Sequence, residues 1–516
     1  MTLNSLDASA SKDKARTPKN GAIIALILVA VMGFTLLGSI SGPGWAPTPL
    51  TASLTVQRAD TSIGSRALTA PQGSYETSVE VVTIKLTDEV SVLASVYRPI
   101  GAPGKRPGMV FLHGAGTATH RQFEPHARAI ASTGIVTIVP DKRLDTYTTA
   151  ERDYVAMARD YRASGEYLQS LPEIDRTKVG YYGESEGAYI ASIIAGSYPD
   201  SAFLILVSAP VVPPREQATY ATDNYLRNTH VPEPLLTIIP RGLGPQMPGG
   251  VLSYADFDVR PYLERVKAPV FMAYGTGDTS MPIVQGAQQV IADIAKNGNS
   301  AYTVRYYANA NHGIKVNQQI VPAFLRDVSR WTAGLPDTAK AEPRVAGEQP
   351  VQQFLAEPPP KPKWYADGDM IVIGLLAGPA MVVALPLLGL ATGGITRLVR
   401  GRRGERAMGV SRAATWTLLR TSSAAALAAI GAWVLYIAYI VTVANLAVNY
   451  RTNALAVDGG WAVTRMAAII AVAALIFAVR ALIQTHRDPV RLPVWLAITL
   501  LGLLGGRVSG SLCVRL

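Results

Sequence analysis

The stretch Gly183-Glu184-Ser185-Glu186-Gly187 lies between an apolar run at 178–182 and a helical run at 188–195. Glycines two residues before and two residues after a serine allow a strained turn and let strand and helix approach closely. Such a turn lifts the serine hydroxyl out of the sheet and exposes it. The bare pattern is a weak signal, for which an ordinary glycine-flanked turn is the alternative. Between a strand and a helix, it predicts a nucleophile elbow with Ser185 as the nucleophile.

A serine hydroxyl needs a general base, and the chain holds six histidines. In a fold with this elbow the acid follows the serine and the histidine comes last. Three histidines precede Ser185, one lies in a Pro-rich insertion and one lies in a basic loop near the C-terminus: His113, His120, His126, His230 and His486. His312, after the strand-like run 302–307, is therefore the predicted base. With an ordinary pKa of about 6.5, it can take and return a proton.

The acid is expected in the loop after the preceding strand. The apolar run 270–274 leads into Gly275-Thr-Gly-Asp278, so Asp278 is the predicted carboxylate. It would fix the tautomer of His312 and stabilise the imidazolium. The alternative is a turn aspartate that caps a helix beginning near Pro282.

The oxyanion that forms during acyl transfer needs backbone donors. One is expected from the N–H of Glu186, which follows the nucleophile. The second is expected from the turn 113–116, His-Gly-Ala-Gly, where Gly114 or Ala115 can present an N–H with little obstruction. We interpret His113 as the histidine of this oxyanion loop, and His120 and His126 as surface or loop-packing residues.

Two carboxylates, Glu184 and Glu186, flank the nucleophile. They either disfavour anionic substrates or turn their side chains towards solvent or a nearby arginine. The sequence leaves both readings open.

Together with Asn-His-Gly at 311–313, the three motifs quoted above resemble the α/β-hydrolase superfamily, and within it the dienelactone hydrolase, acyl-esterase and prolyl-oligopeptidase-like branch. The resemblance covers residues 78–336. It implies an α/β-hydrolase fold and a Ser-His-Asp triad, but such folds carry esterases, thioesterases, peptidases and acyltransferases.

The hydrophobic pattern predicts an α/β class fold without reference to the motifs. Runs at 78–85 and 90–97 read as an opening hairpin. Short continuous apolar runs follow, mostly separated by helical stretches, which indicates a buried and mostly parallel sheet. The strand runs are 108–112, 135–139, 179–182, 203–207, 270–274 and 303–307, and the helical stretches are 122–133, 150–171, 187–197, 283–296 and 317–334.

An insertion rich in Pro and Gly at about 210–262 interrupts this alternation. It is expected to form a cap over the active site. Its large apolar side chains are candidates either for the walls of an acyl pocket or for the cap's own core: Tyr220, Tyr225, Leu235 and Leu236.

The sequence also predicts membrane-spanning segments. Residues 21–40 are apolar, follow a basic stretch and are long enough to cross a bilayer. We predict a signal anchor there, with a cleaved signal peptide as the alternative. Four more spans are predicted near the C-terminus, at 370–390, 422–446, 467–482 with its flanks, and 494–510.

The basic residues orient these spans. The loop at 397–412 is rich in arginine and the loop at 484–492 is basic, whereas 447–461 holds only Arg451. By the positive-inside rule, the N-terminus is cytoplasmic and the hydrolase domain is extracytoplasmic in a multi-pass cell membrane protein. The predicted parts are a basic N-terminus (1–20), the signal anchor (21–40), a polar tether (41–77), the hydrolase domain (78–336), a Pro-rich linker (337–369) and a four-span transmembrane domain (370–516).

The charge distribution and the cysteine content argue against a nucleic-acid-binding protein and against a domain held by an intrachain disulfide. The chain has a net charge of +11, but residues 41–369 hold 30 basic and 32 acidic residues. The basicity therefore marks membrane topology, and no nucleic acid partner is expected. The single cysteine, Cys513, excludes an intrachain disulfide. No phosphate-binding, dinucleotide or zinc motif accompanies the triad, so neither a cofactor nor a metal is implied.

The favoured function is a membrane-bound serine esterase or acyltransferase that acts on small-molecule or lipid acyl esters of the cell envelope. A surface serine peptidase is second and would need an amine-binding acidic site, for which Glu184 and Glu186 are candidates. A non-catalytic binding module is third. The last four spans either anchor the domain or present lipid-borne substrate. Gly502, Gly506 and Gly510 suggest close helix packing, either within the bundle or with a membrane partner.

Overall fold

The computed structural model describes residues 43–64, 69–244, 252–364, 367–370, 412–449 and 451–487, with a few single residues besides. The chain divides into two compact units. The larger one comprises Pro43–Asp369 with Leu446–Thr452, and the smaller one holds most of the apolar segments. We describe each unit by itself.

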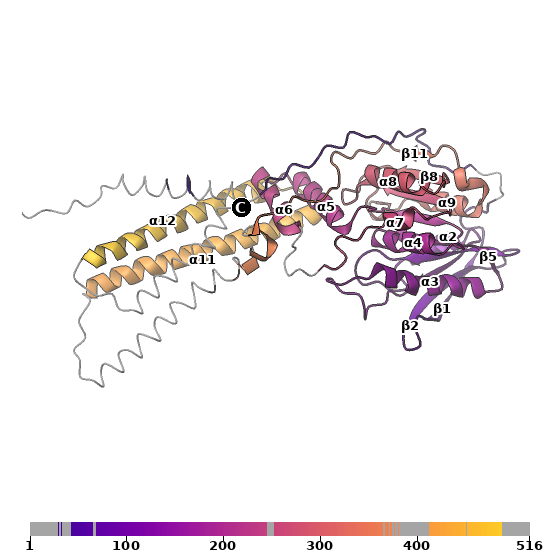
Figure 1. Cartoon of the computed structure of the whole chain (residues 1–516), viewed down its shortest axis with the longest axis horizontal. Helices are drawn as coiled ribbons and strands as arrows, with labels where there is room; N and C mark the ends of the chain where they lie inside the picture. The colour runs from indigo at the N-terminus through magenta and orange to yellow at the C-terminus, as the bar shows by residue number, and fades with distance from the viewer. Residues whose placement is uncertain are drawn as a thin grey trace, which may run out of the picture. The chain divides into compact units, whose positions relative to one another are not determined.

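A nine-stranded sheet in the order β1-β2-β4-β3-β5-β6-β7-β8-β11 forms the centre of the larger unit (Figure 1). Its strands are β1 (Thr77–Lys85), β2 (Ser91–Pro99), β3 (Arg106–Leu112), β4 (Val136–Pro140), β5 (Ile174–Glu184), β6 (Leu204–Val207), β7 (Val270–Gly275), β8 (Tyr302–Tyr307) and β11 (Val345–Gly347). The β1–β2 and β2–β4 pairs are antiparallel, and the other pairs are parallel. The predicted hairpin and mostly parallel sheet are confirmed, and the arrangement is consistent with an α/β-hydrolase.

Helices cover both faces of the sheet. On one face, α2 (Glu124–Ala131) and α9 (Pro322–Ala333) contact each other and share a core with β3 and β7. The opposite face carries α3 (Tyr154–Ser170), α4 (Glu186–Ser197), α7 (Arg260–Leu263) and α8 (Ile283–Ala295). Because both faces are covered, every residue of β6 and β7 is buried, which explains their continuous apolar sequences.

The segments predicted as a tether and a linker are partly built into this unit. The Leu50 N–H donates to the carbonyl of Gln353 at 2.9 Å, and the Gln57 N–H donates to that of Val345 at 3.0 Å. Strand β11 extends the sheet beside β8. The predicted boundaries at 78 and 336 therefore fall inside the folded unit. Backbone groups make these bonds, so the polar and Pro-rich composition gives no sign of them.

Helix α8 begins without a side-chain cap from its own N-terminal residue, Pro282. Instead, the amide oxygen of Gln352 accepts from the N–H groups of Val284 at 3.0 Å and Gln285 at 3.1 Å. The returning segment thus satisfies two donors that a helix N-terminus leaves open.

The predicted cap contains α5 (Pro214–Asn228), η1 (Glu233–Thr237) and α6 (Ile238–Leu243). Trp45 packs on Leu236 and Ile239, and its indole N–H donates to Asp223 of α5 at 2.6 Å. Tyr220 packs with Val212 and Ala356. Leu236 and Tyr220 are thus buried against residues of this segment and of the segments before and after the predicted hydrolase domain. Helix α7, at the end of the predicted insertion, packs on α4 and α8 and belongs to the main fold.

The smaller unit contains most of α11 (Arg412–Val448) and all of α12 (Gly460–Arg487), and a π-helical turn, η4 (Leu455–Gly459), leads directly into α12. Gly460 lies against the ring of Tyr439, and the Tyr439 and Trp461 ring centroids are 6.0 Å apart. The two helices therefore pack closely at this end.

Two segments among the described residues, Arg420–Val448 and Leu455–Ala481, are long and apolar enough to cross a membrane. The first contains the predicted span 422–446. The second begins twelve residues before the predicted 467–482, because the helix continues through Gly459 and Gly460, where the sequence suggests a loop. The predicted spans at 21–40, 370–390 and 494–510 lie almost wholly outside the described residues.

Candidate functional site

Ser185 lies at a strained turn between β5 and α4, with φ 56° and ψ −121°. Its N–H donates to the carbonyl of Val207, at the end of β6, at 2.9 Å. A Cβ at Gly183 would overlap the backbone of Gly187, and one at Gly187 would overlap the carbonyl of Leu112. The two glycines are therefore required by close backbone contacts, as the motif predicts.

Asp278 and His312 meet across the loops that follow β7 and β8. The Nδ1 atom of His312 lies 2.9 Å from Oδ2 of Asp278, whose side chain is fully buried. The other carboxylate oxygen accepts from the N–H of Ser280 at 2.9 Å and from its hydroxyl at 2.6 Å. Asp278 therefore orients His312 and does not cap α8.

This pairing shifts both pKa values. Burial alone would raise the pKa of Asp278, but His312 and the two bonds from Ser280 hold it below its ordinary value. Burial alone would lower the pKa of His312, but the Asp278 carboxylate raises it above its ordinary value. The pair is thus arranged to stabilise a proton on His312.

A corner at the end of β6 connects the serine and histidine loops. The Val207 carbonyl accepts from Ser185, and the hydroxyl of Ser208 donates to the carbonyl of His312 at 2.7 Å. Ser208 itself has a φ of 46°. Sequence reasoning missed Ser208, because nothing in the sequence marks a serine after a strand as a support for a distant loop.

The two predicted sources of oxyanion donors lie on either side of Ser185. Glu186 is the first residue of α4, and the N–H groups of a first turn have no partner within their helix. From the other side, a Cβ at Gly114 would lie 3.2 Å from Cβ of Ser185. The N–H of Gly116 donates to the hydroxyl of Tyr147 at 2.9 Å, which leaves Gly114 and Ala115 as the candidate donors.

The His113 ring points into the core below this turn. It stacks on Phe123, and its Nε2 donates to the carbonyl of Pro140 at 2.8 Å. Burial lowers the pKa of His113 to about 4. His113 thus supports the turn from inside.

His126 differs from the prediction, because it lies in the core and not at the surface. It packs between Phe123 and Phe324, and neither ring nitrogen has a partner among the described residues. Burial lowers its pKa to about 4. His120 is also buried and bonds to Asp141 at 2.7 Å, whereas His230 is exposed.

The two carboxylates beside Ser185 have different surroundings. Glu186 is 5% exposed and is turned inward to a lysine and an arginine, so it faces neither a substrate anion nor a substrate amine. The Tyr182 hydroxyl donates to Glu184 at 3.3 Å. Burial raises the pKa of Glu184, although the positive charges of His312 and Lys315 oppose this effect.

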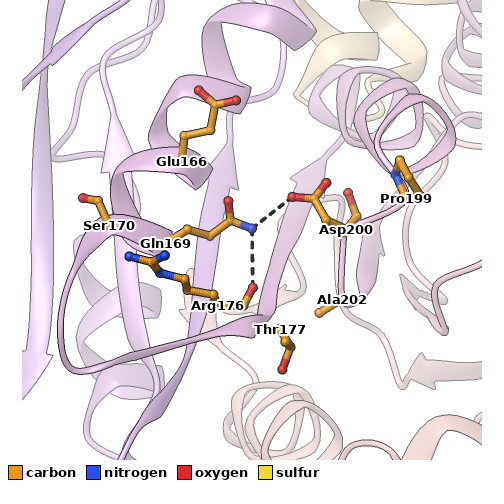
Figure 2. Close-up of a pocket in the computed structure, with 9 residues that line it drawn as sticks. Glu166, Gln169, Ser170, Arg176, Thr177, Pro199, Asp200 and Ala202 are labelled. Carbon is orange, nitrogen blue, oxygen red and sulfur yellow. Dashed lines mark hydrogen bonds between the residues drawn. The ribbon is translucent and has the colours of Figure 1, made fainter.

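An open groove of about 690 Å³ lies elsewhere on the larger unit, beside the start of β5 and the segment that leads into β6 (Figure 2). Its polar groups are partly engaged with one another, since the Gln169 amide donates to Asp200 at 3.1 Å and to the carbonyl of Arg176 at 3.4 Å. Thr177 in its lining precedes Ser185 by eight residues along β5, a separation of roughly 26 Å. The groove is thus at the opposite end of the sheet from Ser185.

No group of three or more metal-ligating side chains was found within the described ranges.

Comparison with known proteins gives a partial match. Residues 161–324 match the family model described as BAAT / Acyl-CoA thioester hydrolase C terminal. This range contains Ser185, Asp278 and His312, and it ends before the predicted transmembrane segments near the C-terminus. No curated protein sequence matches the chain.

Many solved structures align with the chain. The 2,6-dihydroxy-pseudo-oxynicotine hydrolase is 15% identical, covers 53% of this chain and 72% of its own, and has a TM-score of 0.38. Dienelactone hydrolase from Anabaena variabilis is 15% identical, with 50% and 96% covered and a TM-score of 0.33. An esterase from Pyrococcus furiosus is 19% identical, with 50% and 89% covered and a TM-score of 0.33.

Proposed function

We propose that this protein is a membrane-anchored serine hydrolase or acyltransferase with Ser185, His312 and Asp278 as its catalytic triad. The observation that carries the proposal is the 2.9 Å contact between His312 and Asp278 at the sheet edge where the strained Ser185 turn lies. Catalytic groups of open α/β sheets gather at the carboxyl ends of the strands. The loops after β5, β7 and β8 supply all three residues.

In the proposed reaction, Ser185 Oγ attacks the acyl carbonyl while Nε2 of His312 takes its proton. The carbonyl π electrons move to oxygen, and the N–H of Glu186 and one from the 114–115 turn stabilise that oxyanion. As the intermediate collapses, His312 gives its proton to the leaving group, which departs. Water or another hydroxyl then attacks the acyl-enzyme by the same route. The first acceptor gives hydrolysis, and the second gives acyl transfer.

Acyl esters are the proposed substrate class, with oxygen esters and thioesters both included. Thioesters are included because of the description of the matching family model. A peptidase is less well supported, because one of the two candidate amine-binding carboxylates, Glu186, is already paired with Lys142 and Arg152.

We further propose a multi-pass protein of the cell membrane with a cytoplasmic N-terminus and an extracytoplasmic larger unit. The two apolar helices among the described residues and the placement of the basic loops support this topology. Lipid acyl esters in the bilayer are then within reach as substrates.

The test is a substrate panel with the full-length protein in detergent or vesicles. Matched acyl chains are supplied as an oxygen ester, a thioester and an anilide, with Ser185→Ala as the blank. Turnover of either ester that disappears in Ser185→Ala supports the proposal. Turnover of the anilide alone would favour the peptidase, and turnover retained in Ser185→Ala would refute the triad.

A further inference from the structure

A buried cluster of charged and phenolic side chains lies directly behind the elbow, with the carboxylate of Glu186 at its centre. One oxygen accepts from Lys142 at 3.2 Å and from the Tyr147 hydroxyl at 2.9 Å. The other accepts from Arg152 at 2.5 Å and from the Tyr154 hydroxyl at 3.1 Å. We call these five residues the Glu186 cluster. A carboxylate with four donors is held firmly in place.

Lys142 is the most deeply placed cation of this cluster. Its side chain has no exposed surface, and its ammonium lies 4.3 Å from the ring centre of Tyr147. Burying an ammonium is costly unless its charge is paired and its protons are bonded. The salt bridge, the cation–π contact and the hydrogen bonds of Lys142 together meet this requirement. They hold its ammonium group in one position.

Two members of the cluster reach the predicted oxyanion turn. Lys142 donates to the carbonyl of Gly114 at 2.5 Å, and the Tyr147 hydroxyl accepts from the N–H of Gly116 at 2.9 Å. These bonds hold the two peptide groups on either side of Ala115. The turn that faces Ser185 is therefore tied to the side chain of the residue that follows Ser185.

The bond from Lys142 sets the direction of a specific donor. A trans peptide is planar, so its C=O and N–H point in opposite directions. The carbonyl of Gly114 and the N–H of Ala115 belong to one peptide, so holding the carbonyl at Lys142 directs the N–H away from it. An ammonium on the carbonyl also polarises the peptide and makes its N–H a stronger donor.

We propose that Lys142 is a positioning residue for the oxyanion hole, acting through the Gly114 carbonyl on the N–H of Ala115. Glu186 then contributes twice, because its N–H is one oxyanion donor and its carboxylate fixes the lysine that orients the other. This inference rests on the proposed function and goes beyond the triad.

The test uses the full-length protein and two substrates, a short-chain aryl ester and its thiono analogue, in which sulfur replaces the carbonyl oxygen. Sulfur is a poorer hydrogen-bond acceptor, so the preference for the oxygen ester reports on the oxyanion donors. For Lys142→Met we expect a loss in kcat of about 10- to 100-fold, with KM changed by less than about threefold. The preference for the oxygen ester should shrink by a similar factor.

Two further variants complete the design. Tyr147→Phe keeps the ring under Lys142 but removes the acceptor for Gly116, and should reduce the same preference to a smaller extent. It also keeps the test decisive if Lys142→Met does not fold. Lys178→Met is the matched control, because this lysine is half exposed and lies 3.8 Å from Asp175. It should leave both measurements unchanged.

Failure of this inference differs from failure of the proposed function. If the wild-type protein turns over neither ester, the proposed function fails and the inference fails with it. If the wild type is active and folded Lys142→Met and Tyr147→Phe keep its preference for the oxygen ester, the inference alone is overturned. A loss in kcat that is equal for both esters would also overturn it, since that would indicate a general structural role.

Discussion

Nδ1 of His312 and Oδ2 of Asp278 lie 2.9 Å apart, although 34 residues separate them in the chain. The carboxylate is buried and bonded on its other oxygen by Ser280. The carboxylate therefore holds the ring of His312 in one orientation, and in the proposed mechanism Nδ1 carries the proton and Nε2 serves as the base.

Replacing the acid tests this orientation. Asp278→Asn should lower kcat by about 10⁴-fold while the protein stays folded, because the amide no longer fixes the required tautomer. Ser280→Ala removes only the supporting hydroxyl and should cost less than about tenfold. Steady-state kinetics on an ester substrate measure both. A loss in Asp278→Asn no greater than that in Ser280→Ala would contradict the assignment.

The pH dependence of kcat/KM should follow His312. The base works only when neutral, and Asp278 raises its pKa, so activity should rise with pH through a midpoint above the ordinary value of 6.5. Removing the carboxylate leaves burial as the main influence, so the midpoint in Asp278→Asn should move to lower pH. Residual activity between about pH 5 and 9 gives the measurement. An unchanged midpoint would show that the pH dependence does not arise from the His312–Asp278 pair.

Acid stability should depend on His126. Burial lowers its pKa to about 4, so its stabilising contribution is complete above about pH 6.5 and is lost as the pH falls towards 4. The shift corresponds to about 3 kcal/mol. Between neutral pH and about pH 4.5, the free energy of unfolding should therefore fall less in His126→Leu than in the wild type. Denaturant unfolding of both proteins at the two pH values provides the comparison. An identical pH dependence of their stability would contradict this prediction.

The elbow should not tolerate a methyl group at Gly187. A Cβ there overlaps the Leu112 carbonyl, so Gly187→Ala should lower stability by about 1–3 kcal/mol and displace Ser185. Gly64→Ala is the control, because nothing lies within 4 Å of its Cβ position. Thermal unfolding and ester turnover report the two effects. Full activity in Gly187→Ala would show that the turn is not under this constraint.

Much of the larger unit is predictable from the sequence, because its buried strands are short continuous apolar runs separated by helical stretches. The runs at 203–207 and 270–274 became β6 and β7 within one residue at each end. Ser185, Asp278 and His312 could be selected because chain order and the elbow motif narrow the choices. The structure brings His312 and Asp278 together, and the selection of all three as catalytic residues stays a prediction.

Other features depend on contacts that no local pattern records. Strand β11 has three residues, too few to show alternation, and pairs with β8 only in the folded chain. Lys142 and Glu186 are 44 residues apart, and a lysine after a strand reads as a solvated residue until burial is known. The same holds for His126, whose helix gives no sign that its ring faces Phe324.

The most direct test of the central claim is covalent labelling of the full-length protein with a fluorophosphonate probe, followed by peptide mass spectrometry. The account predicts one adduct, on Ser185, that requires native structure and is lost in His312→Ala but kept in His230→Ala. Such selectivity follows because only an activated serine reacts readily with this probe. Absence of an adduct on Ser185 in active protein, or an adduct on another serine that accounts for the activity, would contradict the account.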